Sequence, residues 1–328
     1  RFAAGALAAL ALAAGSILPA QAAVPAAAPG GEARQSAAHP VLLPGQLTRI
    51  MESVGAAVAA GDSAKDAKKL RDRVSGAALT MRSANYRVRA GKGEVAAPVP
   101  VSAGPVLTSM ISSTPEWPRT AVAVTKGKKN PVPQVIVLSQ ATARENYKMI
   151  GAMQMLPGTK FPQVSTDEGG TAAVAATDKD GLAYSPNQAL ELLSGYLTNG
   201  GNAKTVAKNT FADQIHAFQK DQQASNKNAK ITFSRSLDEK SVRTLRTADG
   251  GAVVFGYLRN LMRSVPSKTG ARVELSPDFA ALAGADSTTE GVDVTYAEAV
   301  FVQVPPAGSK DKVSLVGVAQ ELVAARLK

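Results

Sequence analysis

The stretch Thr247-Ala248-Asp249-Gly250-Gly251, followed by the apolar run Ala252-Val253-Val254-Phe255-Gly256-Tyr257-Leu258, decides the fold. An Asp-Gly-Gly step adopts the positive φ angles of a tight hairpin turn, and the β-branched and aromatic residues after it suit a half-buried strand. We therefore predict a hairpin in the middle of a sheet, with Val242–Arg246 as the incoming strand. Side chains alternate along a strand. One face should carry Val253, Phe255 and Tyr257, and the other Val254 and Leu258.

The composition describes a globular chain without cysteine chemistry. Its 328 residues suffice for about two domains of ordinary size beside a non-globular N-terminal segment. Hydrophobic residues make up 45% of the chain but aromatic residues only 5%, so the cores should consist of Val, Leu and Ala. Cysteine is absent, which excludes disulfides, thiolate nucleophiles, zinc sites built on Cys and a lipid-anchored cysteine.

Basic charge is concentrated in the first part of the chain. The formal net charge is +11, and residues 41–184 contain 18 basic and 11 acidic residues. The densest run, Lys65–Arg73, mixes both signs at helical spacing, which is typical of a solvated helix face. The alternative is a surface that binds an anionic partner such as phospholipid or cell-wall polymer. A nucleic-acid partner is not predicted, because no aromatic residues interleave with the basic ones.

The N-terminal segment predicts export. Residues 1–23 combine a basic start, an apolar run and the small-residue site Ala20-Gln21-Ala22, the pattern of a secretory signal peptide. The alternative is a membrane anchor, because the apolar run approaches the roughly 20 residues that span a bilayer. Residues 24–44, rich in Ala, Pro and Gly, are predicted to form a flexible tether. Both interpretations make the rest of the chain extracytoplasmic, either secreted or membrane-tethered.

A first module is predicted over residues 45–180, with helices before strands. An apolar stripe predicts a helix from Gln46 to Gly61, where the glycine should end it. Ser63 should cap a second helix, with Asp66 as its capping-box partner. The predicted third helix and the strands after it are Ala77–Ala90, Ala121–Thr125, Gln134–Ser139 and Tyr147–Leu156. A Gly-, Asp- and Thr-rich stretch at residues 167–184 is predicted to link this module to the next.

A second module is predicted over residues 185–328, in the same order. Ser185-Pro186-Asn187-Gln188 is a helix start with a capping box, and Gly200 should end that helix. A further helix should carry Phe211, Ile215 and Phe218 on one face. Apart from the hairpin, the predicted strands are Ile231–Arg235, Arg272–Leu275, Val292–Val304 and Val313–Leu322. The fold class is therefore α+β: two tandem modules, each with helices packed on a curved antiparallel sheet and each expected to fold alone.

Four short motifs carry a family resemblance. They are Arg73-Val74-Ser75-Gly76, Pro115-Glu116-Trp117-Pro118-Arg119, the stretch Arg246–Phe255 and Val302-Gln303-Val304-Pro305. With them the chain resembles uncharacterised actinobacterial exported proteins, secreted or lipid-anchored. That resemblance implies an N-terminal signal, a tether and two modules, but no activity or catalytic residues. By element order alone, each module also resembles the cone-shaped cystatin-like and nuclear transport factor 2-like fold.

His216 is the one histidine inside a predicted module. Asp213 precedes it by three residues, so the two side chains could meet on one helix face as an acid/base pair. Such a site would lie in the cavity of the second module, with Phe211, Phe255 or Tyr257 as apolar walls. The alternative is an amphipathic helix whose polar edge includes a solvent-facing His216, and this is the outcome we expect, because no second convergent polar group accompanies it.

A binding surface is the second candidate site. Trp117 lies between two prolines, which could present the indole rigidly to a sugar or protein; alternatively, and this is the interpretation we favour, it plugs the core of the first module. The turn after residue 125 adds Lys126, Lys128 and Lys129 to this possible surface.

No cofactor or metal site is predicted. Asp178-Lys179-Asp180-Gly181 has its glycine at the wrong position for a calcium loop and should form a turn. Dinucleotide, phosphate-loop and metalloprotease motifs are missing from the sequence. We therefore expect a non-catalytic extracytoplasmic binding protein of the cell envelope, whose partner is an anionic envelope component or another envelope protein. The alternative is a small-molecule-binding protein or a cavity enzyme of isomerase or hydrolase type that uses the second module. The sequence does not indicate an oligomeric state.

Overall fold

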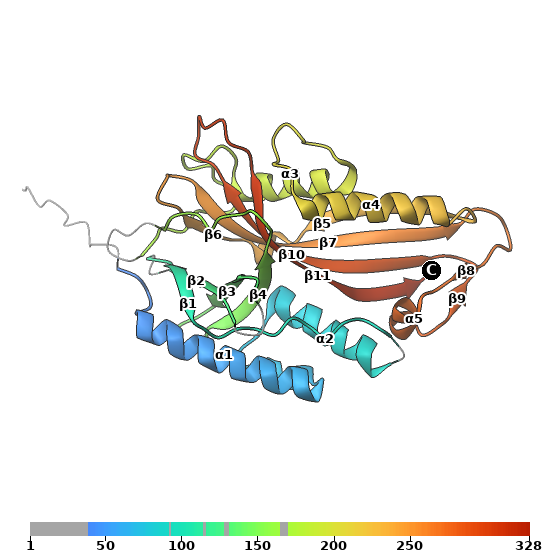
Figure 1. The fold of residues 1–328 in the computed structure, drawn as a ribbon, viewed down its shortest axis with the longest axis horizontal. Helices are drawn as coiled ribbons and strands as arrows, with labels where there is room; N and C mark the ends of the chain where they lie inside the picture. Colours follow the sequence, from blue (N-terminus) through green and yellow to red (C-terminus); the bar gives the residue numbers. More distant parts are fainter. Residues whose placement is uncertain (1–38, 92, 114–115, 128–130, 165–169) are drawn as a thin grey trace, which may run out of the picture. The chain divides into compact units, whose positions relative to one another are not determined.

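The computed structural model describes residues 39–91, 93–113, 116–127, 131–164 and 170–328 (Figure 1). The predicted signal segment and most of the tether lie outside them. The fold class is α+β, as predicted. The helices are α1 (Pro44–Ala64), α2 (Gly76–Ala90), α3 (Pro186–Asn199), α4 (Thr210–Ser225) and α5 (Pro277–Ala283), with short 3-10 helices η1 (Ala67–Leu70) and η3 (Glu239–Ser241). The strands are β1 (Val106–Ile111), β2 (Arg119–Thr125), β3 (Gln134–Gln140), β4 (Lys148–Met155), β5 (Ala229–Leu237), β6 (Arg243–Arg246), β7 (Ala252–Pro266), β8 (Val273–Glu274), β9 (Ser287–Thr288), β10 (Val292–Val304) and β11 (Ser314–Leu327).

The predicted hairpin is confirmed, but it lies at the edge of the sheet and not in its middle, because β6 pairs only with β7. β6 and β7 pair antiparallel on either side of a turn in which Gly250 has a φ of 82°. Asp249 fixes the turn, because its Oδ1 accepts hydrogen bonds from the Thr247 hydroxyl and from the Gly251 amide. The two faces of β7 are also as predicted. Val253, Phe255 and Tyr257 belong to one buried cluster, and Val254 and Leu258 belong to another.

One antiparallel sheet runs through both halves of the chain. Its strand order is β1-β2-β3-β4-β11-β10-β7-β5, and β6 pairs with the part of β7 that β5 leaves open. β10 pairs with β7 along its whole length and with β11 from Val292 to Gln303. β4 joins β11 through just two residue pairs, Gly317 with Met155 and Val318 with Gln154. The hydrogen-bonded connection between the halves is therefore narrow.

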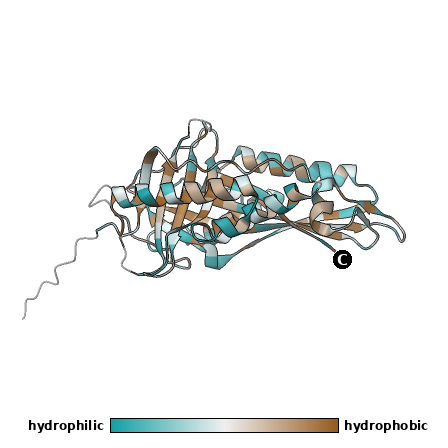
Figure 2. Ribbon diagram, turned by 90° about the horizontal axis from the view of Figure 1, so that it is seen from below, coloured by the Kyte–Doolittle hydropathy of each residue, from teal (hydrophilic) through white to brown (hydrophobic). Residues whose placement is uncertain are grey.

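Helices cover both faces of the sheet. In the first half, α1 packs on the strands through Met51 and Val54, which share a buried cluster with Ile136 of β3. In the second half, α3 and α4 cover one face of β7 and β10, where Leu190 and Val300 share another cluster. Figure 2 shows the result: the strands are mainly brown, and the helices over them alternate between teal and brown residues.

A third buried cluster, here called the shared core, joins the two halves. It contains Val122, Val135 and Met153 from the first half and Phe255 and Phe301 from the second. Neighbouring residues of β2 and β3 belong to the α1 cluster, so these strands bury one face on α1 and the other in the shared core. The two halves accordingly form one compact unit, which spans residues 37–328. Separate tandem modules are therefore not confirmed.

The predicted linker belongs to this unit. In its described part, residues 170–184, the amide of Thr171 donates to the Ile111 carbonyl at 2.8 Å, and its hydroxyl donates to the Arg246 carbonyl at 2.7 Å. Val174 and Leu182 are buried. The described part of the linker is therefore hydrogen-bonded to β1 in the first half and to β6 in the second. The predicted turn at Asp180-Gly181 is confirmed.

Helix ends were predicted with mixed success. The Ser185 capping box and the left-handed end at Gly200 are confirmed. Gly61, however, lies inside α1, where an added Cβ atom would clash with the Leu70 side chain. This glycine therefore allows close packing and does not end the helix. Ser63 consequently caps nothing, and the cap of η1 is Asp66, which accepts from the Lys68 amide.

A buried ion pair anchors α3 to the second half of the sheet. Arg235 on β5 and Glu298 on β10 have fully buried side chains and form two hydrogen bonds, of 2.9 and 3.0 Å. Arg235 also donates to the carbonyl of Leu197 near the end of α3. Asn260 and Gln320 donate to the same carboxylate, which compensates its removal from water.

Three structured segments were not predicted. β1 forms an edge strand ahead of the first predicted strand, Ala121–Thr125. α5 begins at Ser276-Pro277, the same type of start as that of α3. The predicted tether also ends early. Val41 donates its amide to the Ser112 carbonyl at 2.9 Å, and Leu42 is buried.

Candidate functional site

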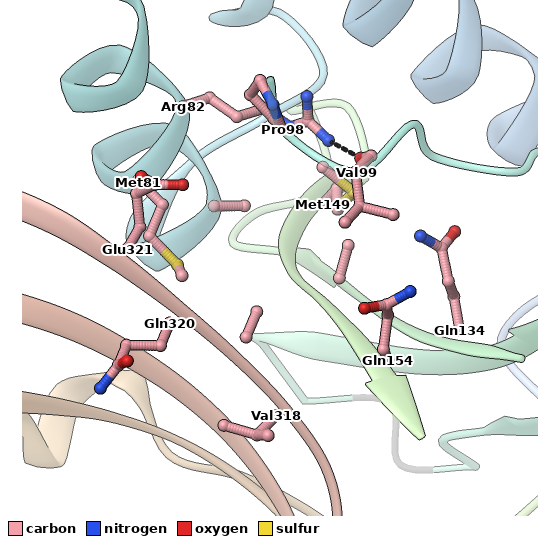
Figure 3. Close-up of a pocket in the computed structure, with 13 residues that line it drawn as sticks. Met81, Arg82, Pro98, Val99, Gln134, Met149, Gln154, Val318, Gln320 and Glu321 are labelled. Atoms are coloured by element: carbon pink, nitrogen blue, oxygen red, sulfur yellow. Dashed lines mark hydrogen bonds between the residues drawn. The ribbon is translucent and has the colours of Figure 1, made fainter. Parts of the chain in front are cut away.

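One partly enclosed cavity, of about 210 Å³, lies where β3, β4 and β11 meet beneath α2. We call it the seam cavity, because it lies where the two halves of the sheet join. Figure 3 shows side chains from α2, from both halves of the sheet and from the segment at residues 95–103, here called the strap. The lining residues are Ala78, Met81, Arg82, Pro98, Val99, Gln134, Met149, Ala152, Gln154, Val318, Ala319, Gln320 and Glu321.

The strap covers the cavity without joining the sheet. Pro98 and Pro100 have no amide hydrogen to give to a ladder, so side chains hold the strap instead. Arg82 donates to the Val99 carbonyl at 2.8 Å, the bond drawn in Figure 3. Gln134 donates to the Pro100 carbonyl at 3.0 Å and accepts from the Ser102 amide at 3.1 Å. Loss of these bonds would free the strap while every strand pair stayed intact.

Arg82 is itself fixed from the opposite side. Its Nη1 donates to both carboxylate oxygens of Asp62 on α1, and Tyr86 donates its hydroxyl to the same carboxylate. Burial, followed by the hydrogen bond to Asp62, raises the pKa of Tyr86, so the hydroxyl keeps its proton. The guanidinium is neutralised by Asp62, and its Nη2 remains directed at the strap.

Glu321 is the titratable acid of the seam cavity. Burial raises its pKa from 4.5 to about 7, against smaller lowering effects of the Asn85 hydrogen bond and the Arg82 charge; Asp278 raises it slightly. Asn85 donates to Glu321 Oε1 at 3.3 Å and to the Ala96 carbonyl at 2.8 Å. The Oδ1 of Asn85 is buried without a hydrogen-bond partner. A free hydrogen-bond acceptor and a carboxyl group whose pKa lies near neutral pH are therefore neighbours.

His216 and Asp213 do not form the predicted pair. His216 lies half-buried against α3, with its Nε2 2.9 Å from the Tyr196 carbonyl and its ring edge-on to that of Tyr196. Asp213 is exposed, and no hydrogen bond joins the two side chains in the described part of the chain. His216 lines neither the seam cavity nor the second cavity described below. We expected His216 to face solvent, and this was wrong: the side chain is half-buried, because α4 packs on the end of α3.

The predicted apolar walls belong to opposite faces of the sheet. Phe211 packs in the cluster under α3 and α4, whereas Phe255 and Tyr257 lie in the shared core. These residues cannot line one common cavity, because side chains on the odd positions of β7 point away from α3 and α4.

Trp117 does not plug a core. Its side chain is 36% exposed, and the guanidinium carbon of Arg119 lies 4.2 Å from the ring centroid. The expected plug is therefore wrong, because the indole stacks on a cation at the surface. Lys126 is exposed at the end of β2. Lys128 and Lys129 lie outside the described residues.

Residues 38–326 match the family described as Domain of unknown function (DUF8094). The chain belongs to this family. No curated protein and no solved structure matches it. The DUF8094 match spans both halves of the sheet, so the strap and the whole seam cavity lie inside the family's domain. In the described ranges, the DUF8094 domain has no cluster of three or more potential metal ligands and no helix with the length and apolarity of a membrane span.

The polar residues in and beside the seam cavity were not predicted from the sequence. Arg82 and Asn85 look like the polar edge of a helix, and Gln134 opens an ordinary apolar strand. One signal was present: Gln320 and Glu321 interrupt the otherwise apolar stretch of β11. A carboxylate inside an apolar strand indicates either a buried ion pair or a site.

Proposed function

We propose that the protein is a non-catalytic extracytoplasmic binding protein of the cell envelope, and that the seam cavity holds its ligand. The proposal rests on how the strap is held. Its hydrogen bonds come from the side chains of Arg82, Asn85 and Gln134, so the strap can open without breaking the sheet. The lining supports binding over catalysis. Its described residues include no hydroxyl, thiol or imidazole side chain that could serve as a nucleophile or as a partner for Glu321.

The lining also indicates the chemistry of the ligand. At about 210 Å³ the cavity is smaller than the roughly 300–1,000 Å³ of sites for drug-sized molecules. Met81, Met149 and Val318 offer apolar and polarisable contacts. Protonated Glu321, which lines the cavity, donates one hydrogen bond, and the side-chain amides of Gln154 and Gln320 also belong to the lining. A short aliphatic molecule ending in a primary amide matches this lining, because the amide oxygen accepts from Glu321.

The test uses valeramide, an aliphatic primary amide, as the probe. Saturation-transfer NMR on the full chain at pH 6 should show transfer to the alkyl chain of valeramide. Ala152→Leu fills the cavity and should abolish the transfer, whereas Ala217→Leu, at an exposed position on α4, should leave it unchanged. Binding should weaken several-fold at pH 8.5, because ionised Glu321 no longer donates.

Two results would count against the seam cavity as the ligand site. One is transfer that survives Ala152→Leu as well as Ala217→Leu, since the probe would then bind elsewhere. The other is a failure of valeramide and of related small amides and alcohols to bind at any pH, although the protein melts cooperatively.

The compartment is part of the same proposal, and its support is the signal pattern at residues 1–23. N-terminal sequencing of the mature protein should start near Ala23 or Val24; recovery of the intact segment from the cytoplasm would refute export. We also retain the resemblance to actinobacterial exported proteins and to the cystatin-like cone as part of this proposal. Its support is the order of helices before antiparallel strands in each half.

The envelope partner can be tested separately. If an anionic envelope component binds the basic first half, pull-down from envelope fractions should recover it at low salt and lose it at high salt. Recovery that does not depend on salt would favour another envelope protein held by apolar contacts. No recovery at any ionic strength would contradict the envelope role while leaving the valeramide result untouched.

A further inference from the structure

A second cavity lies on the other side of the start of α2. Its volume is about 470 Å³, within the range of small-molecule sites. It is formed by the start of α2, by η3 and by the β6–β7 hairpin. The lining residues are Ser75, Gly76, Ala77, Thr80, Ile150, Asp238, Lys240, Ser241, Arg243, Phe255, Tyr257 and Arg259.

The charges around this cavity are not balanced. Lys240, Arg243 and Arg259 are cationic, and Asp238 is the one acidic residue of the lining. Asp238 pairs with Arg259 at 3.4 Å. Among the described residues, neither Lys240 nor Arg243 has a carboxylate partner. The cavity therefore has an excess of positive charge that an anion would neutralise.

Arg243 is the strongest single feature. Its Nε donates to the Ser139 hydroxyl at 3.3 Å, and its Nη1 donates to the carbonyls of Lys240 and Val242. Its Nη2 has no hydrogen-bond partner in the described structure. Burial lowers the pKa of this guanidinium, because partial removal from water disfavours its charged form. A half-buried cation held only by neutral groups favours binding of an anion at its free edge.

Two neighbouring features complement this charge. Gly76 and Ala77 line the cavity at the start of α2, and no side chain caps that end of the helix. The positive end of the helix dipole therefore adds to the field of Arg243. On the opposite wall, Arg259 lies 5.6 Å from the centroid of the Tyr257 ring, beside the apolar side chain of Ile150.

We propose that this second cavity binds a small organic phosphate, with the phosphate group between Arg243 and the start of α2 and the organic part against Tyr257. The planar guanidinium suits the bidentate geometry of a phosphate, and its free Nη2 supplies the donors. The proposal goes beyond the seam cavity, because the two sites differ in lining, charge and ligand class. A lipid headgroup and a free metabolite share this chemistry.

The test titrates phenyl phosphate into the full chain by calorimetry at constant ionic strength. Arg243→Gln should weaken binding at least tenfold. Arg259→Gln removes a rim charge from an exposed side chain and should weaken it a few-fold without affecting the fold. The matched control is Arg272→Gln, which makes the same charge change next to β8, at the far end of β7 (Figure 1), and should leave the affinity unchanged.

Lipid vesicles distinguish a phosphate on a lipid headgroup from a phosphate on a free metabolite. Vesicles that contain phosphatidic acid carry a phosphate monoester, and neutral vesicles of phosphatidylcholine do not. Binding of phenyl phosphate without vesicle binding supports a free metabolite; binding of both, with competition between them, supports a headgroup. Equal weakening by Arg243→Gln and Arg272→Gln would overturn the proposal, because the attraction would be unspecific. The proposal would also be overturned if the Arg259→Gln variant binds phenyl phosphate as tightly as the unchanged protein while its melting curve shows that it is properly folded.

Discussion

The carboxyl group of Glu321 couples the seam cavity to pH. The folded protein holds its proton more tightly than the unfolded chain does, since its pKa is about 7 in the fold and ordinarily 4.5 for a glutamate in water. The protonated carboxyl group therefore contributes its full stability to the fold below pH 4.5, and this contribution is lost as the pH rises through 7. Well above pH 7 the carboxylate is charged and still buried, so the fold then carries the full cost of keeping this charge out of water.

Glu321→Gln should remove that penalty. At pH 8 we expect the variant to be more stable than the unchanged protein by on the order of 2 kcal/mol, and at pH 5 the two should differ little. Urea unfolding at both pH values measures the difference. Glu52→Gln, at an exposed position on α1, is the control and should show no such change with pH. A gain of equal size at both pH values would contradict burial of the charged group as the cause.

At the same scale, sequence patterns indicate which residues are buried but not which polar groups meet. The alternation along β7 correctly separated Phe255 from Val254. It could not reveal that Glu321 and Asn85 are neighbours, because 236 positions separate them in the chain. His216 and Asp213 attracted attention because they are close in sequence, yet helix packing directs His216 to the Tyr196 carbonyl.

The strap is the element that most directly affects access to the site. Its prolines predict an extended segment, and the sequence indicates nothing about what it covers. Regular strands such as β10 could be predicted to the residue because their hydrophobic pattern is complete. The strap has no such pattern, since its hydrogen bonds end on side chains from α2 and β3.

Gln134→Ala should loosen the strap. It removes the bonds to Pro100 and Ser102, so the amides of residues 101–103 should exchange with deuterium more rapidly. Stability should fall by about 1–3 kcal/mol, because the strap groups lose buried partners. Gln140→Ala is the matched control, since its amide holds only the turn at Glu145. Unchanged exchange in the strap would show that Arg82 and Asn85 suffice to hold it.

At the scale of the whole molecule, the shared core couples the two halves. The sequence predicts modules that fold alone, because each half has its own helices and strands. It could not show that β2 and β3 bury a second face against Phe255 and Phe301, since an all-apolar strand does not reveal its partner.

The structure leads to the opposite expectation for isolated fragments. Fragments 39–180 and 183–328 should each lack a cooperative melt, because each exposes half of the shared core. An equimolar mixture in which the two fragments associate should again show one cooperative melt. Thermal unfolding followed by circular dichroism measures the isolated fragments and the mixture. Two separate cooperative transitions from the isolated fragments would establish the tandem modules and refute this expectation.

The shared core also has a consequence during synthesis on the ribosome. Strands β2 to β4 emerge well before β7 and β10, which cover their second face. About a hundred residues separate the two groups of strands. At a synthesis rate of roughly 5–20 residues per second, the apolar face therefore stays uncovered for about ten seconds. Nascent chains shorter than about 300 residues should therefore require a holding chaperone that the finished protein does not need.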